Sequence, residues 1–177
     1  NMGTADLDPG AGTLNVTTTN TGTIYETNIS FLAKYDLGGD PVWANSLGGF
    51  TPHIAVEQGG NAIYFTSANE ATPLTEEDFD PTGGALPPVA STEPAADYMA
   101  LIRYDANGEV VWSVFESGYA DFDQNDNRGN ALALDADGNV YWAGEFGMDM
   151  SQYPGNDMTI DAPGTGRDGF LVKYSSA

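Results

Sequence analysis

The chain of 177 residues carries 26 acidic and 5 basic residues, a formal net charge of −21, and it has no cysteine. This charge argues against nucleic acid and anionic membrane surfaces as partners, because both would be repelled, and the lack of cysteine rules out disulfides and thiolate chemistry. No apolar run approaches the roughly 18 residues of a membrane span. With 22 Gly, 10 Pro and no long helical periodicity, the composition predicts an all-β protein with one sizeable core.

Two hairpins are predicted in the first part of the chain. In the first, residues 31–35 and 42–43 flank a turn that contains Gly38-Gly39. In the second, residues 53–56 and 62–65 flank Gly59-Gly60. Such turns need backbone angles that Gly tolerates, so a Gly pair between apolar runs is a strong hairpin signal.

Both hairpins recur further along the chain. The first returns at residues 100–112 and the second at 131–144, and the strand FLAKY of residues 31–35 appears a third time as FLVKY at 170–174. We label the four strand types a (53–56 and 131–134), b (62–65 and 140–144), c (31–35, 100–104 and 170–174) and d (42–43 and 110–112). The order c, d, a, b, c, d, a, b, c predicts a repeated unit of four antiparallel strands.

Long insertions separate each type-b strand from the next type-c strand. Residues 5–12 and 77–84 share an Asp-x-Asp-Pro pattern, and residues 152–157 are a weaker third copy. Residues 1–28 therefore resemble an insertion whose preceding type-a and type-b strands are absent, and helix is expected only within the insertions. We predict one domain over 1–177, divided into a partial unit (1–47), a complete unit (48–116) and a partial unit (117–177).

The repeat resembles a known family. A strand such as FLVKY, an Asp-x-Asn-Gly turn, a Val-x-Trp strand and then ALALDADGNVY at 131–141 resemble the bacterial β-propeller repeat known as the SBBP repeat. The Asp-Phe-Asp-Pro insertion resembles those of large secreted and surface proteins. This resemblance, which covers nearly the whole chain, implies propeller blades and an extracellular or cell-surface location. Trp142 and Phe65 depart from the small or β-branched residues usual there. The Trp hairpins also resemble the quinone-dehydrogenase propeller repeat, which the other strands fit less well.

About two and a half blades are too few to close a propeller, which needs about 4 to 8. We therefore expect either further segments of a longer chain or self-association. The strand at 168–174 would be an open edge, and such an edge pairs readily with a strand of another chain. The type-d strand absent after Ser175 and the strands absent before Asn1 are complementary, so head-to-tail donation would give a ring or a filament.

One basic residue recurs in every type-c strand, as Lys34, Arg103 and Lys173, at intervals of 69 and 70 residues. Each shares a strand face with a leucine two residues earlier. We predict structural ion pairs between blades for these three residues, with a ligand-binding role as the alternative.

The three tryptophans receive two predictions. Trp43 and Trp112 occupy equivalent type-d positions, which indicates core packing. Trp142 has no Trp counterpart. It is the candidate for a carbohydrate-stacking or interface position, with core packing as the favoured alternative.

A calcium site is the candidate metal site. The oxygen-bearing side chains lie in the segment 121–127, as Asp121, Asp123, Asn125, Asp126 and Asn127. Calcium takes six to eight oxygen ligands, but Asp126 replaces the Gly of an EF-hand loop and Leu132 replaces its bidentate Glu. An ordinary acidic loop explains the same residues, and a solvated acidic surface or adaptation to salty surroundings explains the overall charge. The pairs Asp6/Asp8 and Asp78/Asp80 are weaker candidates, because Asp before Pro-x-Gly is also ordinary turn chemistry.

No motif supports catalysis. His53 is the single histidine and has no recognisable nucleophile motif beside it, and there is no phosphate-binding glycine loop. We therefore predict a non-enzymatic extracellular or cell-surface propeller module that acts as a scaffold, adhesin or subunit of an assembly. The alternative is a carbohydrate-binding or carbohydrate-cleaving secreted propeller, which fold analogy alone leaves open.

Overall fold

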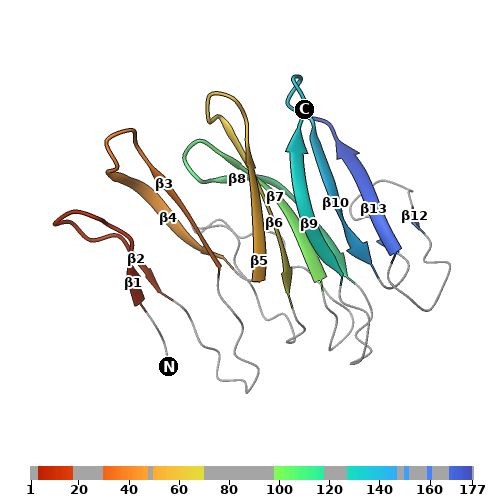
Figure 1. Cartoon of the computed structure of the whole chain (residues 1–177), viewed down its shortest axis with the longest axis horizontal. Coiled ribbons are helices and arrows are strands. Elements are labelled where there is room, and N and C mark those ends of the chain that lie inside the picture. Colours follow the sequence, from red (N-terminus) through yellow and green to blue (C-terminus); the bar gives the residue numbers. More distant parts are fainter. Residues whose placement is uncertain are drawn as a thin grey trace, which may run out of the picture.

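The computed structural model describes residues 4–17, 30–47, 50–69, 98–117, 127–146, 150–151, 159–160 and 168–176. These residues form antiparallel strands and turns with no helix among them (Figure 1), which confirms the all-β prediction. Within this described part, no helix is long and apolar enough to span a membrane. The insertions 77–84 and 152–157 lie outside the described residues, whereas residues 4–17 form a hairpin.

Thirteen strands are described, in five antiparallel sheets. They are β1 (Thr4–Asp6), β2 (Asn15–Thr17), β3 (Ser30–Tyr35), β4 (Pro41–Leu47), β5 (Phe50–Val56), β6 (Ala62–Asn69), β7 (Tyr98–Asp105), β8 (Val110–Ser117), β9 (Arg128–Leu134), β10 (Val140–Phe146), β11 (Met150–Ser151), β12 (Thr159–Ile160) and β13 (Asp168–Tyr174). Strands β1 and β2 pair with each other, as do β11 and β12.

Three sheets contain the repeated strands. The first sheet is the hairpin β3–β4, the central sheet has the order β5-β6-β7-β8, and the last sheet has the order β9-β10-β13. The central sheet thus contains one strand of each type in the order a, b, c, d, as the sequence pattern predicts. The first sheet contains types c and d, and the last contains types a, b and c.

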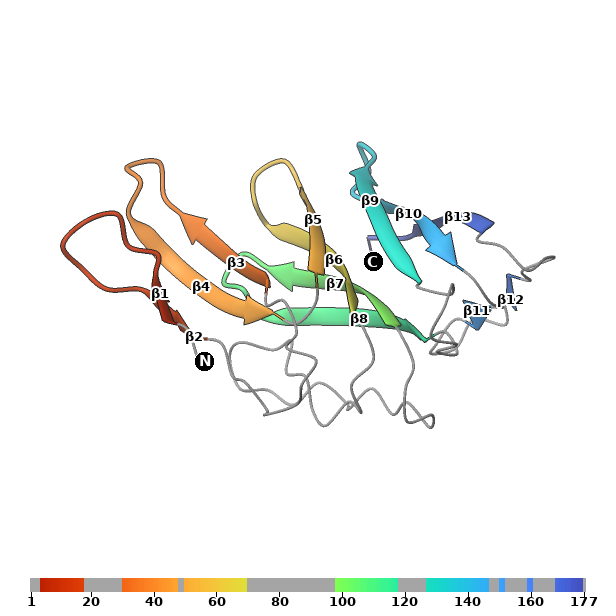
Figure 2. The ribbon, with the colours of Figure 1, turned by 60° about the horizontal axis from the view of Figure 1, so that its bottom comes forward.

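The three sheets stack face to face in chain order, as an open row whose hairpin turns lie along one side (Figures 1 and 2). One apolar cluster fills the space between the first and central sheets and includes Leu32, Phe65 and Ile102. A second cluster, with Tyr64 and Trp142 among its members, fills the space between the central and last sheets. The core therefore lies between sheets, and the inner strands β6 and β7 of the central sheet are buried on both faces.

Because side chains alternate between the two faces of a strand, each side chain faces one of the two adjacent sheets. In β7, Leu101 belongs to the cluster facing the last sheet, whereas Ala100 and Ile102 belong to the cluster facing the first sheet. In β13, Phe170 and Val172 face back toward the central sheet, and Leu171 faces outward. Because side chains alternate with period two, every type-c strand presents its Leu and basic residue to the sheet that follows in the row.

Local turn chemistry explains the hairpins. Asp36, Asp105 and Asp135 each begin a turn, and in each turn the carboxylate Oδ1 accepts two backbone N–H bonds of 2.8–3.0 Å from residues two and four positions later. The glycine that closes the turn has φ of 88°, 85° and 81° at Gly39, Gly108 and Gly138. Asp stabilises the start of such a turn and only Gly adopts this φ without strain, so the motif is readable from the sequence.

Candidate interaction surface

The buried junction between the central and last sheets is built from two cross-sheet hydrogen bonds and several aromatic contacts. The Tyr64 hydroxyl donates to the carbonyl oxygen of Gly138 at 3.2 Å, and Trp142 Nε1 donates to Thr66 Oγ1 at 2.9 Å. The Trp142 ring lies edge-on to Phe170 with 5.2 Å between centroids. A polar tip that finds a partner lets Tyr and Trp be buried without leaving a donor unsatisfied.

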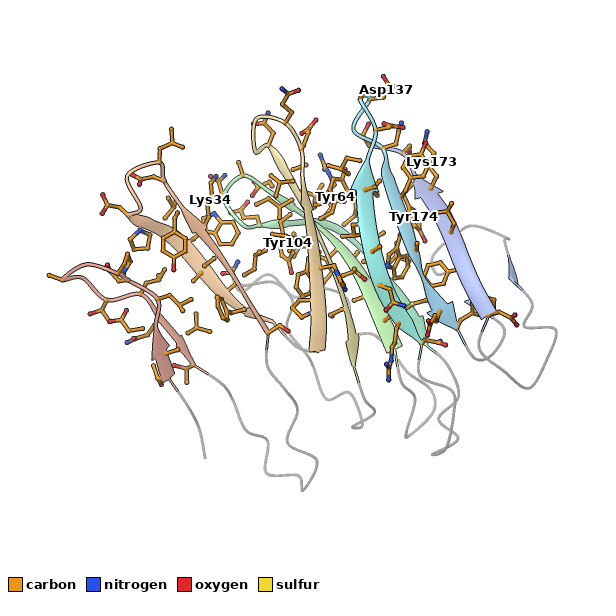
Figure 3. The ribbon with its side chains drawn as sticks, in the orientation of Figure 1. Lys34, Tyr64, Tyr104, Asp137, Lys173 and Tyr174 are labelled. Carbon is orange, nitrogen blue, oxygen red and sulfur yellow. The ribbon has the colours of Figure 1, made fainter. Side chains whose placement is uncertain are left out.

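The junction between the first and central sheets uses a related contact. Lys34, labelled in Figure 3, donates from Nζ to the carbonyl oxygen of Ala106 at 2.7 Å, and Trp43 Nε1 donates to the same oxygen at 3.2 Å. Ala106 lies in the β7–β8 turn, beside Gly108. A Cβ on Gly108 would lie 3.1 Å from the Trp43 ring, so this glycine also lets the indole approach.

The outer face of the last sheet repeats the residues of the buried face of the central sheet. In the register, Tyr141 is opposite Lys173 on this face, as Tyr64 is opposite Arg103 in the central sheet. Leu171 corresponds to Leu101, but it is 69% exposed whereas Leu101 is fully buried. A face that is core in one sheet is therefore open surface in the next.

Lys173 and Asp135 form an ion pair on this outer face. Lys173 Nζ lies 2.9 Å from Asp135 Oδ2 and 5.0 Å from the centroid of the Tyr141 ring. Hydrogen bonds from the Asn139 side chain and from Lys173 hold the pKa of Asp135 well below its usual range. The Tyr141 hydroxyl and Asp135 together raise the pKa of Lys173. Both charged groups are solvent-accessible, so water screens their attraction.

The free edge of the last sheet is strand β13. It pairs with β10 along all seven of its residues, and among the described strands it has no partner on its other side. Strand β7, the equivalent strand of the central sheet, pairs with both β6 and β8. Arg103 of β7 is opposite Trp112 of β8, and the described part of the last sheet has no such tryptophan beside Lys173.

The three recurring basic residues therefore have three different surroundings. Lys34 does cross to the next sheet, but its described partner is a carbonyl oxygen instead of the expected carboxylate. Lys173 has a carboxylate partner, but that partner lies in the same sheet. Arg103 Nε is buried and has no hydrogen-bond partner among the described residues.

Trp142 is fully buried between the central and last sheets, in agreement with core packing, the favoured alternative, and not with a carbohydrate-stacking position. Its indole occupies the register position of Phe65, so it faces back along the row toward the central sheet. Trp43 and Trp112 are half-buried and pack against the two apolar clusters, as core residues would.

Most of the candidate calcium loop, namely Asp121, Asp123, Asn125 and Asp126, lies outside the described residues. Asn127 is described and is 1% exposed, directly before β9. In the part of the chain that the structure covers, no three His, Cys, Asp or Glu side chains cluster as a metal site. The Asp6 carboxylate instead accepts the backbone N–H groups of Asp8 and Leu14, which lower its pKa, in keeping with ordinary turn chemistry.

The sequence reasoning missed Tyr141, Leu171 and Asp135 as surface residues. The signal that identifies the first two is their register equivalence to Tyr64 and Leu101, which can be read by aligning the repeats. Comparison of the chain with models of known protein families gave no match, and a search of curated proteins gave none either.

Proposed function

We propose that this chain is a non-enzymatic β-propeller-type repeat module that serves as a scaffold, adhesin or subunit of an assembly outside the cell or at its surface. Another chain segment or a neighbouring subunit then supplies the strand that completes the last sheet. The stacked four-stranded arrangement of the central sheet and the resemblance to SBBP repeats support the module type and the location. Calcium bound by residues 121–127 would brace the acidic loop before β9.

The observation that carries this proposal is the difference between β7 and β13. The two strands have the same residue pattern, ALIRY and FLVKY, yet only β7 has a type-d neighbour in the described structure. An unpaired strand edge exposes a row of backbone donors and acceptors and takes an added strand readily. Trp142, which suggested a carbohydrate-binding alternative, is core, so that alternative has no support from the described residues.

A peptide with the sequence of β8 tests the proposal. A synthetic EVVWSVFES peptide, residues 109–117, should add to the free edge of β13 as β8 adds to β7. Hydrogen exchange of isotope-labelled chain is the measurement. At a peptide concentration ten times the dissociation constant, the outward-pointing β13 amides should exchange about tenfold more slowly.

Two control peptides define specificity. Replacing the peptide's central Ser with Pro removes a backbone donor and should abolish protection. Replacing its Trp with Ala should weaken protection, because the Trp would lie opposite Lys173 as Trp112 lies opposite Arg103. Unchanged exchange of β13 at every concentration of the unmodified peptide would refute strand addition at this edge.

A further inference from the structure

We propose that the outer face of the last sheet, formed by Tyr141, Leu171 and Lys173, docks head-to-tail onto the first-sheet end of a second copy of this chain. The inference rests on the proposed function, since it assumes an assembling module. It concerns a sheet face, however, and not the edge of β13.

Each described junction between sheets includes one hydrogen bond of the same kind. A donor on the earlier sheet reaches a turn carbonyl of the later sheet, as Lys34 Nζ reaches Ala106 O at 2.7 Å and the Tyr64 hydroxyl reaches Gly138 O at 3.2 Å. One donor is the type-c basic residue and the other is the type-b tyrosine. The outer face of the last sheet carries the same two groups, Lys173 and Tyr141, at the equivalent register positions.

Both outward donors are held by one carboxylate of their own sheet. Lys173 Nζ lies 2.9 Å from Asp135 Oδ2, and the Tyr141 hydroxyl lies 3.4 Å from the same oxygen. The Lys173 side chain is 47% exposed, so exchanging this water-screened ion pair for a carbonyl costs little. Asp135 is therefore the acceptor for both donors as long as no sheet of a second copy covers this face.

The apolar residue of this surface, Leu171, also matches its equivalent in the buried junction. Leu171 is 69% exposed in the last sheet, whereas its equivalent Leu101 is fully covered by the sheet that follows it. An exposed leucine next to two oriented donors has the composition of the buried junction, with no covering sheet in the described structure.

The complementary surface lies at the other end of the same chain. In the central and last sheets, the residues that face the preceding sheet include Ile102 and Phe170, and both are buried. On the first sheet the equivalent face is only partly covered, with Phe31 54% exposed and Tyr35 41% exposed. The β1–β2 hairpin reaches this face, where the Tyr35 hydroxyl donates to Leu7 O at 2.6 Å, and still leaves both rings accessible.

The repeat also specifies a polar contact. Leu37 of the β3–β4 turn occupies the place of Ala106 in the β7–β8 turn, so Lys173 would donate to the Leu37 carbonyl oxygen of the second copy. That turn carries Asp36 and Asp40, both exposed, whose negative charge favours an approaching lysine. Two different patches meet, so the contact is heterologous and propagates to a ring or a filament.

Disulfide trapping tests this pairing, because the chain has no cysteine of its own. Phe31→Cys and Leu171→Cys chains are mixed at about 1 M salt, where a Debye length of about 3 Å screens the repulsion between acidic copies. A disulfide-linked heterodimer is expected on mild oxidation. Val111→Cys, at a 49% exposed position of β8, replaces Phe31→Cys in the matched control, which should remain unlinked.

Sedimentation of the full chain provides the second measurement. The wild type should associate with rising concentration, and Leu171→Asp should raise the dissociation constant by about 30-fold or more, because it buries an unpaired charge. Val111→Asp should not change it. Wild-type chain that stays monomeric without forming the mixed disulfide, or preferential linkage of two Leu171→Cys chains, would overturn the proposal. Binding of the β8 peptide tests only the edge of β13, so it shows separately whether the proposed function stands.

Discussion

At the scale of single residues, the acidic turn residues act mainly on their own backbone. Asp105 shows the balance of effects: desolvation raises its pKa, but hydrogen bonds from Glu109 and Asn107 outweigh it and the pKa is lowered. Asp135 has the same backbone bonds and, in addition, Lys173. Some of the many acidic residues therefore stabilise hairpin turns, because a carboxylate is a strong acceptor for backbone N–H groups.

The Asp135 carboxylate predicts a pH dependence. Its folded pKa lies below the ordinary value of 3.8, so its contribution to stability is present above about pH 4 and is lost as the pH falls toward the folded pKa. We expect Asp135→Asn to be less stable than wild type at neutral pH, and the difference to shrink on acidification. Urea unfolding at several pH values measures it. Asp137→Asn removes the same charge from the same turn and leaves the Lys173 pair in place; an equal effect in both variants would contradict the prediction.

At the scale of elements, equivalent strands differ in what covers them. Strand β10 is the middle strand of the last sheet and contributes Val140, Trp142 and Phe146 to the core. Its close packing is visible at Gly144, where an added Cβ would collide with the Arg128 carbonyl oxygen and the Phe170 ring. Strand β8 lies at the edge of the central sheet, and its Trp112 is only half-buried.

This difference predicts the order of two tryptophan variants. Trp142→Ala should cost about 3–5 kcal/mol of unfolding free energy, because it opens a cavity and removes the donor to Thr66. Trp112→Ala should cost less, since solvent already reaches that ring. Chemical denaturation of both variants provides the comparison, and an equal or larger loss for Trp112→Ala would contradict the assignment of Trp142 to the core.

At the scale of the whole molecule, the described sheets form a row with two dissimilar ends. At one end, where the β1–β2 hairpin also lies, Phe31 and Tyr35 are exposed, and at the other end Leu171 and Lys173 are exposed. The net charge of −21 opposes contact between copies at low salt, because like charges repel over a Debye length. In the proposed docking, the salt concentration therefore controls whether the two ends of neighbouring copies associate.

The charge also predicts how salts change stability. Sodium chloride should raise the thermal unfolding midpoint, because screening relieves repulsion within the folded chain. Calcium should raise the midpoint more than magnesium at equal concentration and ionic strength if residues 121–127 hold it, since Ca²⁺ accepts irregular oxygen sites that Mg²⁺ does not. Differential scanning calorimetry makes the comparison, and identical shifts with the two ions would remove the calcium proposal.

Hairpins and strand order were predictable because their causes are local. The turns that begin at Asp36, Asp105 and Asp135 are encoded within five residues each, and the repeated strands indicate which hairpins share a design. The exposed surface was not predictable in the same way. Leu101 and Leu171 have the same residue type and strand position, yet one is core and the other is surface.

The amino-acid sequence by itself determined the all-β class, the turns and the four-strand unit, because alternation and turn chemistry act over a few neighbouring residues. The tertiary structure alone decided that Leu101 is core while Leu171 is surface, that Lys34 donates to a carbonyl oxygen and that Lys173 pairs with Asp135 of its own sheet. Burial and partner choice depend on which sheet lies opposite, and the residues of that sheet are about 70 positions away in the repeat.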